Sequence, residues 1–180
     1  MYVLIFLICL IFVSFAYKFI YRCYYPIKYK EFVDKASRIY DVEKSLIYAI
    51  IKCESNFNKN ANSCAGAVGL MQITPDTFDW LKFYSKEDKE SVEMLNDPEI
   101  NIMYGTLFIS ILKNKYSDMG VVLSAYNAGI KTVNRWLRDD KNSLDRRSLN
   151  YIPYKETREY VRRVKIAEKN YKRIYISGEM

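Results

Sequence analysis

The first hydrophobic pattern along the chain is an unbroken run at its N-terminus. Residues 1–17 contain no charged side chain, and Lys18 and Arg22 follow closely. Continued through residue 21, the run reaches the ~20 residues that a helix needs to cross a bilayer. It lacks the small-residue cleavage site that ends a secretory signal peptide. We therefore expect residues 1–22 to form an uncleaved membrane anchor, residues 23–30 a linker, and residues 31–176 a single globular domain.

After the anchor, the apolar positions follow the period of helices rather than the alternation of strands. The helical period is clear in residues 32–39 and 100–112. Helix starts are indicated at Thr74-Pro75 and Asp97-Pro98, where a capping side chain precedes a proline. Residues 121–137 predict two helices with a break near Asn127-Ala128-Gly129. The pattern therefore predicts an all-α domain.

One helix carries a charged residue on its apolar face. Ile47, Ile50 and Ile51 are followed at the same spacing by Glu54, and polar residues come directly after it. Glu54 thus lies in the last turn, where free carbonyl groups make the helix end negative. Burial and this dipole would both raise the pKa of the carboxyl group, as a general acid requires. A glutamate turned to the rim and fully solvated is the alternative, which periodicity alone favours.

The segment after this helix favours a functional Glu54 over a merely solvated one. Residues 62–75 read NSCAGAVGLMQITP, and their small residues and glycines allow a backbone to approach a ligand closely. Loops of this composition often line binding sites. Gly105, inside the predicted helix 100–112, similarly indicates a close approach by another backbone.

The composition of the chain excludes several kinds of catalytic and metal site. The 180 residues include no histidine, which excludes a Ser-His-Asp triad and an H-E-x-x-H zinc site, so a general acid is most simply a carboxyl group. The four cysteines show no C-x-x-C spacing, and we expect neither a metal nor a cofactor. Cys53 and Cys64 could form a disulfide or remain two separate buried thiols, and the sequence leaves both open.

The chain is basic, with a net charge of +7 and a pI near 9.1. Such a charge suits nucleic acid, lipid headgroups or an acidic wall polymer, or simply a basic soluble surface. No nucleic-acid-binding motif accompanies the charge, so we expect no nucleic-acid partner.

Four motifs in order, CESNF, GAVGLMQITP, SAYNAG and YIPYKETREYV, resemble the lytic murein transglycosylase (SLT) domain of the goose-lysozyme-like superfamily, glycoside hydrolase family 23. The resemblance spans roughly residues 26–168. It implies a lysozyme-like helical domain with a glycan-binding groove. It also implies cleavage of the β-1,4 bond between N-acetylmuramic acid (MurNAc) and N-acetylglucosamine (GlcNAc) in peptidoglycan.

The resemblance also assigns site residues. Glu54 matches the single catalytic acid and base, and the predicted substrate-binding residues are Ser63, Gln72, Tyr126, Asn127, Glu156 and Tyr160. Simpler alternatives exist for three of them: Asn127 could only end a helix, Tyr160 could be packing, and Glu156 could stabilise a helix N-terminus.

A single carboxyl group suffices for a lytic transglycosylase, because the substrate's own C6 hydroxyl replaces water and leaves a 1,6-anhydroMurNAc end. A hydrolytic muramidase and a non-catalytic wall-binding membrane protein are the alternatives. We expect a monomer in the cell membrane, with its domain on the extracytoplasmic side and peptidoglycan strands as its partner. The lysines and arginines after the anchor would alone favour the cytoplasm, so this orientation rests on the implied function.

Overall fold

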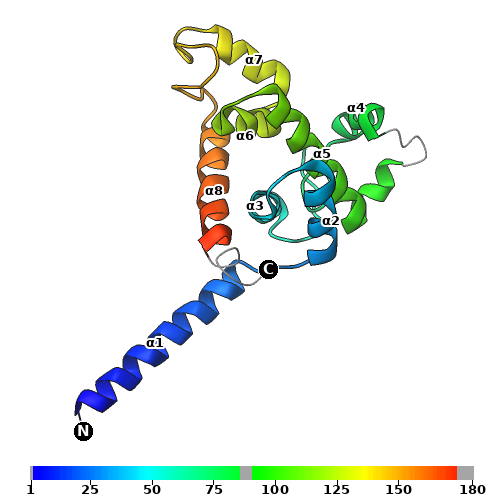
Figure 1. Ribbon diagram of the computed structural model, residues 1–180. Helices are drawn as coiled ribbons and strands as arrows, with labels where there is room; N and C mark the ends of the chain where they lie inside the picture. The colour runs from blue at the N-terminus through cyan, green and yellow to red at the C-terminus, as the bar shows by residue number, and fades with distance from the viewer. Residues whose placement is uncertain (1, 86–90, 174–180) are drawn as a thin grey trace.

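The computed structural model describes residues 2–85 and 91–173, and it shows one long helix projecting from a helical domain (Figure 1). Residues 174–176 of the predicted domain lie outside the described residues. The helices are α1 (Tyr2–Tyr24), α2 (Lys30–Tyr40), α3 (Lys44–Ser55), α4 (Pro75–Ser85), the 3₁₀ helix η1 (Val92–Asn96), α5 (Pro98–Lys115), α6 (Met119–Ala128), α7 (Ile130–Arg138) and α8 (Lys155–Tyr171). Within the described ranges, β structure is limited to isolated bridges of Val68 with Asn62 and Ile73. The all-α prediction is confirmed.

Helix α1 is long and apolar enough to cross a membrane. Its candidate span, Ile5–Tyr24, has a mean hydropathy of 1.9, and none of it is buried against the rest of the chain. The helix continues two residues beyond the predicted anchor.

The segment after α1 is packed on the domain rather than free. Tyr25 is 7% exposed and meets the ring of Tyr171 edge to face, with 5.4 Å between centroids. Asn170 Nδ2 donates to the Tyr25 hydroxyl at 2.7 Å, and the Tyr171 hydroxyl donates to the Pro26 carbonyl at 3.2 Å. Part of the predicted linker therefore belongs to the core, because aromatic rings fix it against the end of α8.

The core centres on α3, which packs along α8. Ile47, Ile50 and Ile51 are fully buried, and the ring of Tyr48 stacks on that of Tyr171. Ile39, at the end of α2, is exposed, although its spacing matched the apolar face of that helix.

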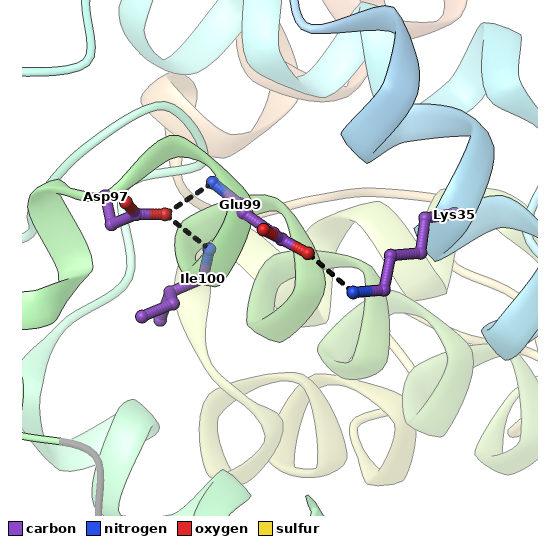
Figure 2. Close-up of polar contacts among 4 residues, drawn as sticks. All are labelled: Lys35, Asp97, Glu99 and Ile100. Carbon is purple, nitrogen blue, oxygen red and sulfur yellow. Dashed lines mark hydrogen bonds and ion pairs between the residues drawn. The ribbon is translucent and has the colours of Figure 1, made fainter.

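Helix α5 begins as its sequence predicts. The Asp97 carboxylate accepts from the backbone N–H groups of Glu99 and Ile100 at 2.8 and 3.2 Å, and Pro98 occupies the first turn (Figure 2). Glu99 also forms an ion pair with Lys35, which connects α5 to α2 (Figure 2). Thr74 caps α4 in the same way, since its hydroxyl accepts from Thr77 N at 3.3 Å.

Gly105 leaves room for a side chain, not for the backbone that the sequence indicated. A Cβ atom at this position would lie 2.4 Å from Met71 Sδ and 2.7 Å from Met71 Cβ. Met71 itself is fully buried. Glycine at this point of α5 therefore allows the methionine that ends the loop to enter the core.

Candidate active site

Glu54 lies in the last turn of α3. The helix ends beyond it because Asn56 adopts a left-handed conformation (φ 49°) and donates its N–H to the Lys52 carbonyl. Burial raises the pKa of Glu54 to about 7, in the direction predicted. The residue still keeps some exposure to solvent. Its carboxyl group is therefore largely desolvated and yet reachable from outside.

Helix α8 supplies the groups that modulate this carboxyl. Glu156, Tyr160 and Arg163 follow at helical spacing, so they share one stripe of α8. The Tyr160 hydroxyl and the Arg163 charge lower the pKa of Glu54, whereas the Glu156 charge raises it. Sequence reasoning missed Arg163, although its spacing from Tyr160 on the same helix face was a usable signal.

Tyr160 packs in the core and also belongs to the site around Glu54. Its side chain is 1% exposed, and burial together with the charge of Glu54 raises its own pKa well above the usual value. Its hydroxyl makes no hydrogen bond of standard geometry within the described part of the chain, although it influences Glu54 directly. The Tyr160 hydroxyl lowers the pKa of Glu54 and so favours the Glu54 carboxylate.

Tyr126, on α6, faces the same place. Burial and the charge of Glu54 both raise the pKa of Tyr126. Its hydroxyl donates to the Met71 carbonyl at 2.7 Å. In this conformation Tyr126 therefore fixes the loop after α3 beside Glu54, and its proton is already committed.

Ser63 and Gln72 both lie in that loop, which connects α3 to α4. The Ser63 hydroxyl accepts from Ala67 N at 3.0 Å, which leaves its proton available, and the residue is exposed. Gln72 has φ 50°, and its amide nitrogen donates to the carbonyls of Ala61 and Gly69 at 3.0 and 2.9 Å. Only the Gln72 side-chain oxygen is left for a ligand.

The loop is held from beneath by Asn101, which the sequence analysis overlooked. Its side-chain oxygen accepts from Met71 N at 2.7 Å, and its nitrogen donates to the carbonyls of Val68 and Leu95 at 2.9 and 2.8 Å. Gly69 packs so closely that a Cβ there would lie 2.2 Å from this nitrogen. The sequence signal for Asn101 was a polar residue on the apolar face of the helix that became α5.

Asn127 and Glu156 lie where α6 and α8 meet. The Asn127 side-chain oxygen accepts from the Thr157 hydroxyl at 2.8 Å, which ties the two helices together. Glu156 is exposed in the first turn of α8. The structure thus places Tyr126, Glu156 and Tyr160 around Glu54, whereas the described contacts of Ser63, Gln72 and Asn127 are to the loop and to α8.

The cysteines do not form the disulfide that was one of the two alternatives. Cys53 and Cys64 are free, and Cys64 is exposed, so they are not two buried thiols either. Burial raises the pKa of Cys53 to about 11 and keeps that thiol protonated. Within the described ranges, no three His, Cys, Asp or Glu side chains gather as metal ligands would.

Chemically, the site offers one proton that is easily exchanged at neutral pH. A carboxyl group with a pKa of about 7 can both donate and accept a proton near that pH. The second carboxyl, Glu156, is exposed on α8. The arrangement is suited to acid and base catalysis by Glu54 alone.

Known proteins resemble this chain in sequence and in fold. The membrane-bound lytic murein transglycosylases C of Pectobacterium atrosepticum and Yersinia pestis are each 37% identical over 81% of this chain. The chain spans about half of their length (47%). Among solved structures, an inactive mutant of lytic transglycosylase Slt from Pseudomonas aeruginosa matches with a TM-score of 0.74 and 26% identity, over 87% of this chain and 25% of that one.

The 70 kDa soluble lytic transglycosylase of Escherichia coli matches with a TM-score of 0.73 and 30% identity, over 86% of this chain and 25% of that one. The profile of the transglycosylase SLT domain matches residues 31–149, which include Glu54, Ser63, Gln72 and Tyr126 but not α8. These matches confirm the resemblance that the four motifs indicated. The chain belongs to the transglycosylase SLT domain family.

Proposed function

We propose that this chain is a lytic transglycosylase that cleaves the MurNAc-β-1,4-GlcNAc bond of peptidoglycan and leaves a 1,6-anhydroMurNAc end. The observation that carries the proposal is the pKa of Glu54, raised to about 7 by burial at the end of α3. Relatives that share the domain are named lytic murein transglycosylases, which supports the same activity.

In the first step, protonated Glu54 donates its proton to the glycosidic oxygen as the bond from C1 of MurNAc to that oxygen breaks. The N-acetyl group of the same sugar would assist at C1, where positive charge develops. In the second step, the Glu54 carboxylate accepts the proton of the C6 hydroxyl, whose oxygen bonds to C1. The glutamic acid is restored, and no water is consumed.

Between the two steps Glu54 is an anion, and its neighbours would stabilise it unequally. The Tyr160 hydroxyl and the Arg163 guanidinium favour the anion, whereas Glu156 and burial favour the protonated acid. This balance keeps both forms accessible at neutral pH. The free proton of Ser63 and the free oxygen of Gln72 are suited to orienting sugar groups in a glycan groove beside the loop.

The decisive variant is Glu54→Gln, which keeps the size of the side chain and removes the exchangeable proton. We expect peptidoglycan solubilisation to fall at least ~10³-fold, as for loss of a general acid and base. Glu159→Gln, on the exposed face of α8, is the matched control and should retain activity. Comparable solubilisation by Glu54→Gln would contradict the proposal.

Mass spectrometry of the released fragments separates the two catalytic outcomes. Anhydro ends are lighter by one water than the reducing ends that a muramidase would leave, so only anhydro ends agree with the proposal. Binding of sacculi without any release of fragments would instead support a non-catalytic wall-binding protein.

We further propose that α1 anchors the chain in the cell membrane, with the domain on the wall side as a monomer. Exposed Cys64 provides a test in spheroplasts of the expressing cell. A membrane-impermeant maleimide should label the wild-type chain more than Cys64→Ser. Equal labelling of the two chains until the membrane is permeabilised would place the domain in the cytoplasm.

A further inference from the structure

A cavity away from Glu54 is lined by several positively charged side chains. It has a volume of about 510 Å³ and lies between the C-terminal ends of α5 and α7 and the loop that follows α7. Lys115, Arg138, Arg146 and Arg147 line it, and no carboxylate is among the lining residues that the structure describes. None of these four residues belongs to the site around Glu54.

Two acidic residues of the same loop, Asp139 and Asp145, accept hydrogen bonds from groups of the loop itself. The Asp139 carboxylate accepts from Lys141 N and Asn142 Nδ2 at 3.0 and 2.9 Å. The Asp145 carboxylate accepts from the N–H groups of Arg147 and Ser148, both at 2.8 Å. No ion pair to the four lining cations occurs within residues 2–85 and 91–173. The cations are therefore available to an external anion.

The lining is also held in place before any ligand binds. Arg146 adopts a left-handed backbone conformation (φ 57°), which the Asp145 turn around it supports. Within the lining, the Tyr116 hydroxyl donates to Asn134 Oδ1 at 2.7 Å, which joins the end of α5 to α7. Such preorganisation lowers the ordering cost of binding.

We propose that this cavity binds a phosphate-bearing anion. Guanidinium groups match phosphate oxygens with paired, charge-assisted hydrogen bonds, and three of the four cations are arginines. Four cations in one lining suit an anion with more than one negative charge better than they suit a single carboxylate. The proposal is independent of the chemistry at Glu54.

The position of the cavity indicates where the anion comes from. The loop after α7 leads into the N-terminal end of α8, which is the end of that helix away from α1 (Figure 1). Headgroups of a bilayer that contains α1 would thus lie toward the opposite end of α8. A phosphodiester polymer or a free phosphate compound is the source that fits this geometry.

The test uses the full chain in nanodiscs of phosphatidylcholine, titrated calorimetrically with inorganic pyrophosphate and with poly(glycerol phosphate). Both should bind, and the double variant Arg146→Gln/Arg147→Gln should weaken both at least ~10-fold, because two charge-assisted contacts are lost. Arg135→Gln, which removes an exposed arginine of α7 outside the cavity, is the matched control and should bind as the wild type does. Glu54→Gln should also bind normally, which separates this site from the catalytic proposal.

Three results would overturn the proposal. One is the absence of pyrophosphate binding, and another is an equal loss in Arg135→Gln and in the double variant. The third is equal affinity for malonate, which would show a site for any dianion rather than for phosphate. If the nanodisc-bound chain instead captured separate phosphatidylglycerol liposomes through Arg146 and Arg147 without binding pyrophosphate, the source would be lipid and the assignment wrong.

Discussion

Two carboxyl groups of this domain, at the end of α3 and in the loop after α7, have pKa values shifted in opposite directions. Burial raises the pKa of Glu54 to about 7. Asp145 is exposed, and hydrogen bonds from Ser148 N, Arg147 N and the Ser148 hydroxyl lower its pKa to about 2. The first group exchanges its proton near neutral pH, and the second stays ionised.

The difference shows that burial and hydrogen-bond donors together decide the role of a carboxyl group here, with burial dominant at Glu54 and donors dominant at Asp145. Asp145 has backbone donors that favour its anion, so it serves as a structural cap for the loop. Glu54 is desolvated by burial, and the Tyr160 hydroxyl is the side-chain donor that favours its anion. Changing the burial or the donors should therefore bring the two pKa values closer together or move them further apart.

The largest effect is expected from removing the Asn101 side chain, which holds the loop after α3 in place. Asn101→Ala deletes three hydrogen bonds and removes the partner that Met71 N has in the wild type, whereas the Val68 carbonyl keeps its bond from Ile73 N at 3.1 Å. We expect a loss of at least ~3 kcal/mol of unfolding free energy, measured by denaturant titration. A looser loop should also lower the pKa of Glu54 toward its ordinary value.

The control for this prediction is Asn114→Ala, an exposed asparagine on the same helix. It should change stability by less than ~0.5 kcal/mol. If the two variants lost similar stability, the loop would not depend on Asn101.

The next effect concerns the pH dependence of stability. Because the pKa of Glu54 is about 7 in the folded chain and about 4.5 in the unfolded chain, the folded state binds the proton more tightly. Wild-type stability should therefore fall as pH rises from about 4.5 to 7, by up to ~3 kcal/mol from this group. Glu54→Gln should lack that decline, whereas Glu159→Gln should keep it. If the unfolding free energies of wild type and Glu54→Gln changed with pH in the same way across this range, burial of the Glu54 carboxyl group would be contradicted.

A smaller effect is expected from Tyr160→Phe. Its hydroxyl lowers the pKa of Glu54, so the variant should raise that pKa further. The alkaline limb of the pH–rate profile should then move to higher pH. Stability should change by less than ~1 kcal/mol, since no well-formed hydrogen bond is lost. Tyr126→Phe, which loses its bond to the Met71 carbonyl, should destabilise the loop without this shift. A downward movement of the limb in Tyr160→Phe would contradict the role given to its hydroxyl.

The smallest effect is expected at Asp145. Its lowered pKa means that the stability it contributes is present above pH ~4 and is lost as pH falls toward about 2. Asp145→Asn should remove that acid-side loss locally. Amide hydrogen exchange at Arg147 and Ser148 is the readout, and protection unchanged by the substitution would show that the cap does not order the loop.

The parts of the fold that the sequence predicted are those set by neighbours in the chain. The caps at Thr74 and Asp97 and the position of Glu54 follow from residues within one or two helical turns. The parts that it missed depend on contacts between distant segments. Met71 enters the core at Gly105, Asn101 supports the loop, and no local pattern specifies either contact.

The same limit applies to the site. Motifs identified Glu54 and its partners on α6 and α8, but the role of Arg163 requires knowing which face of α8 meets α3. Gln72 was expected at the sugar, whereas its amide nitrogen holds the loop. Tyr25, expected in a linker, is buried because aromatic residues of α8 lie next to it.

The most direct test of the central claim is a titration of Glu54 by carbon-13 NMR in the chain labelled at glutamate carboxyl groups, with the signal assigned by its loss in Glu54→Gln. The account predicts a midpoint near 7, well above the 4.5 of an ordinary glutamate carboxyl group. A midpoint near 4.5 would show a hydrated, ordinary carboxyl group and would contradict the proposed role of Glu54 as proton donor.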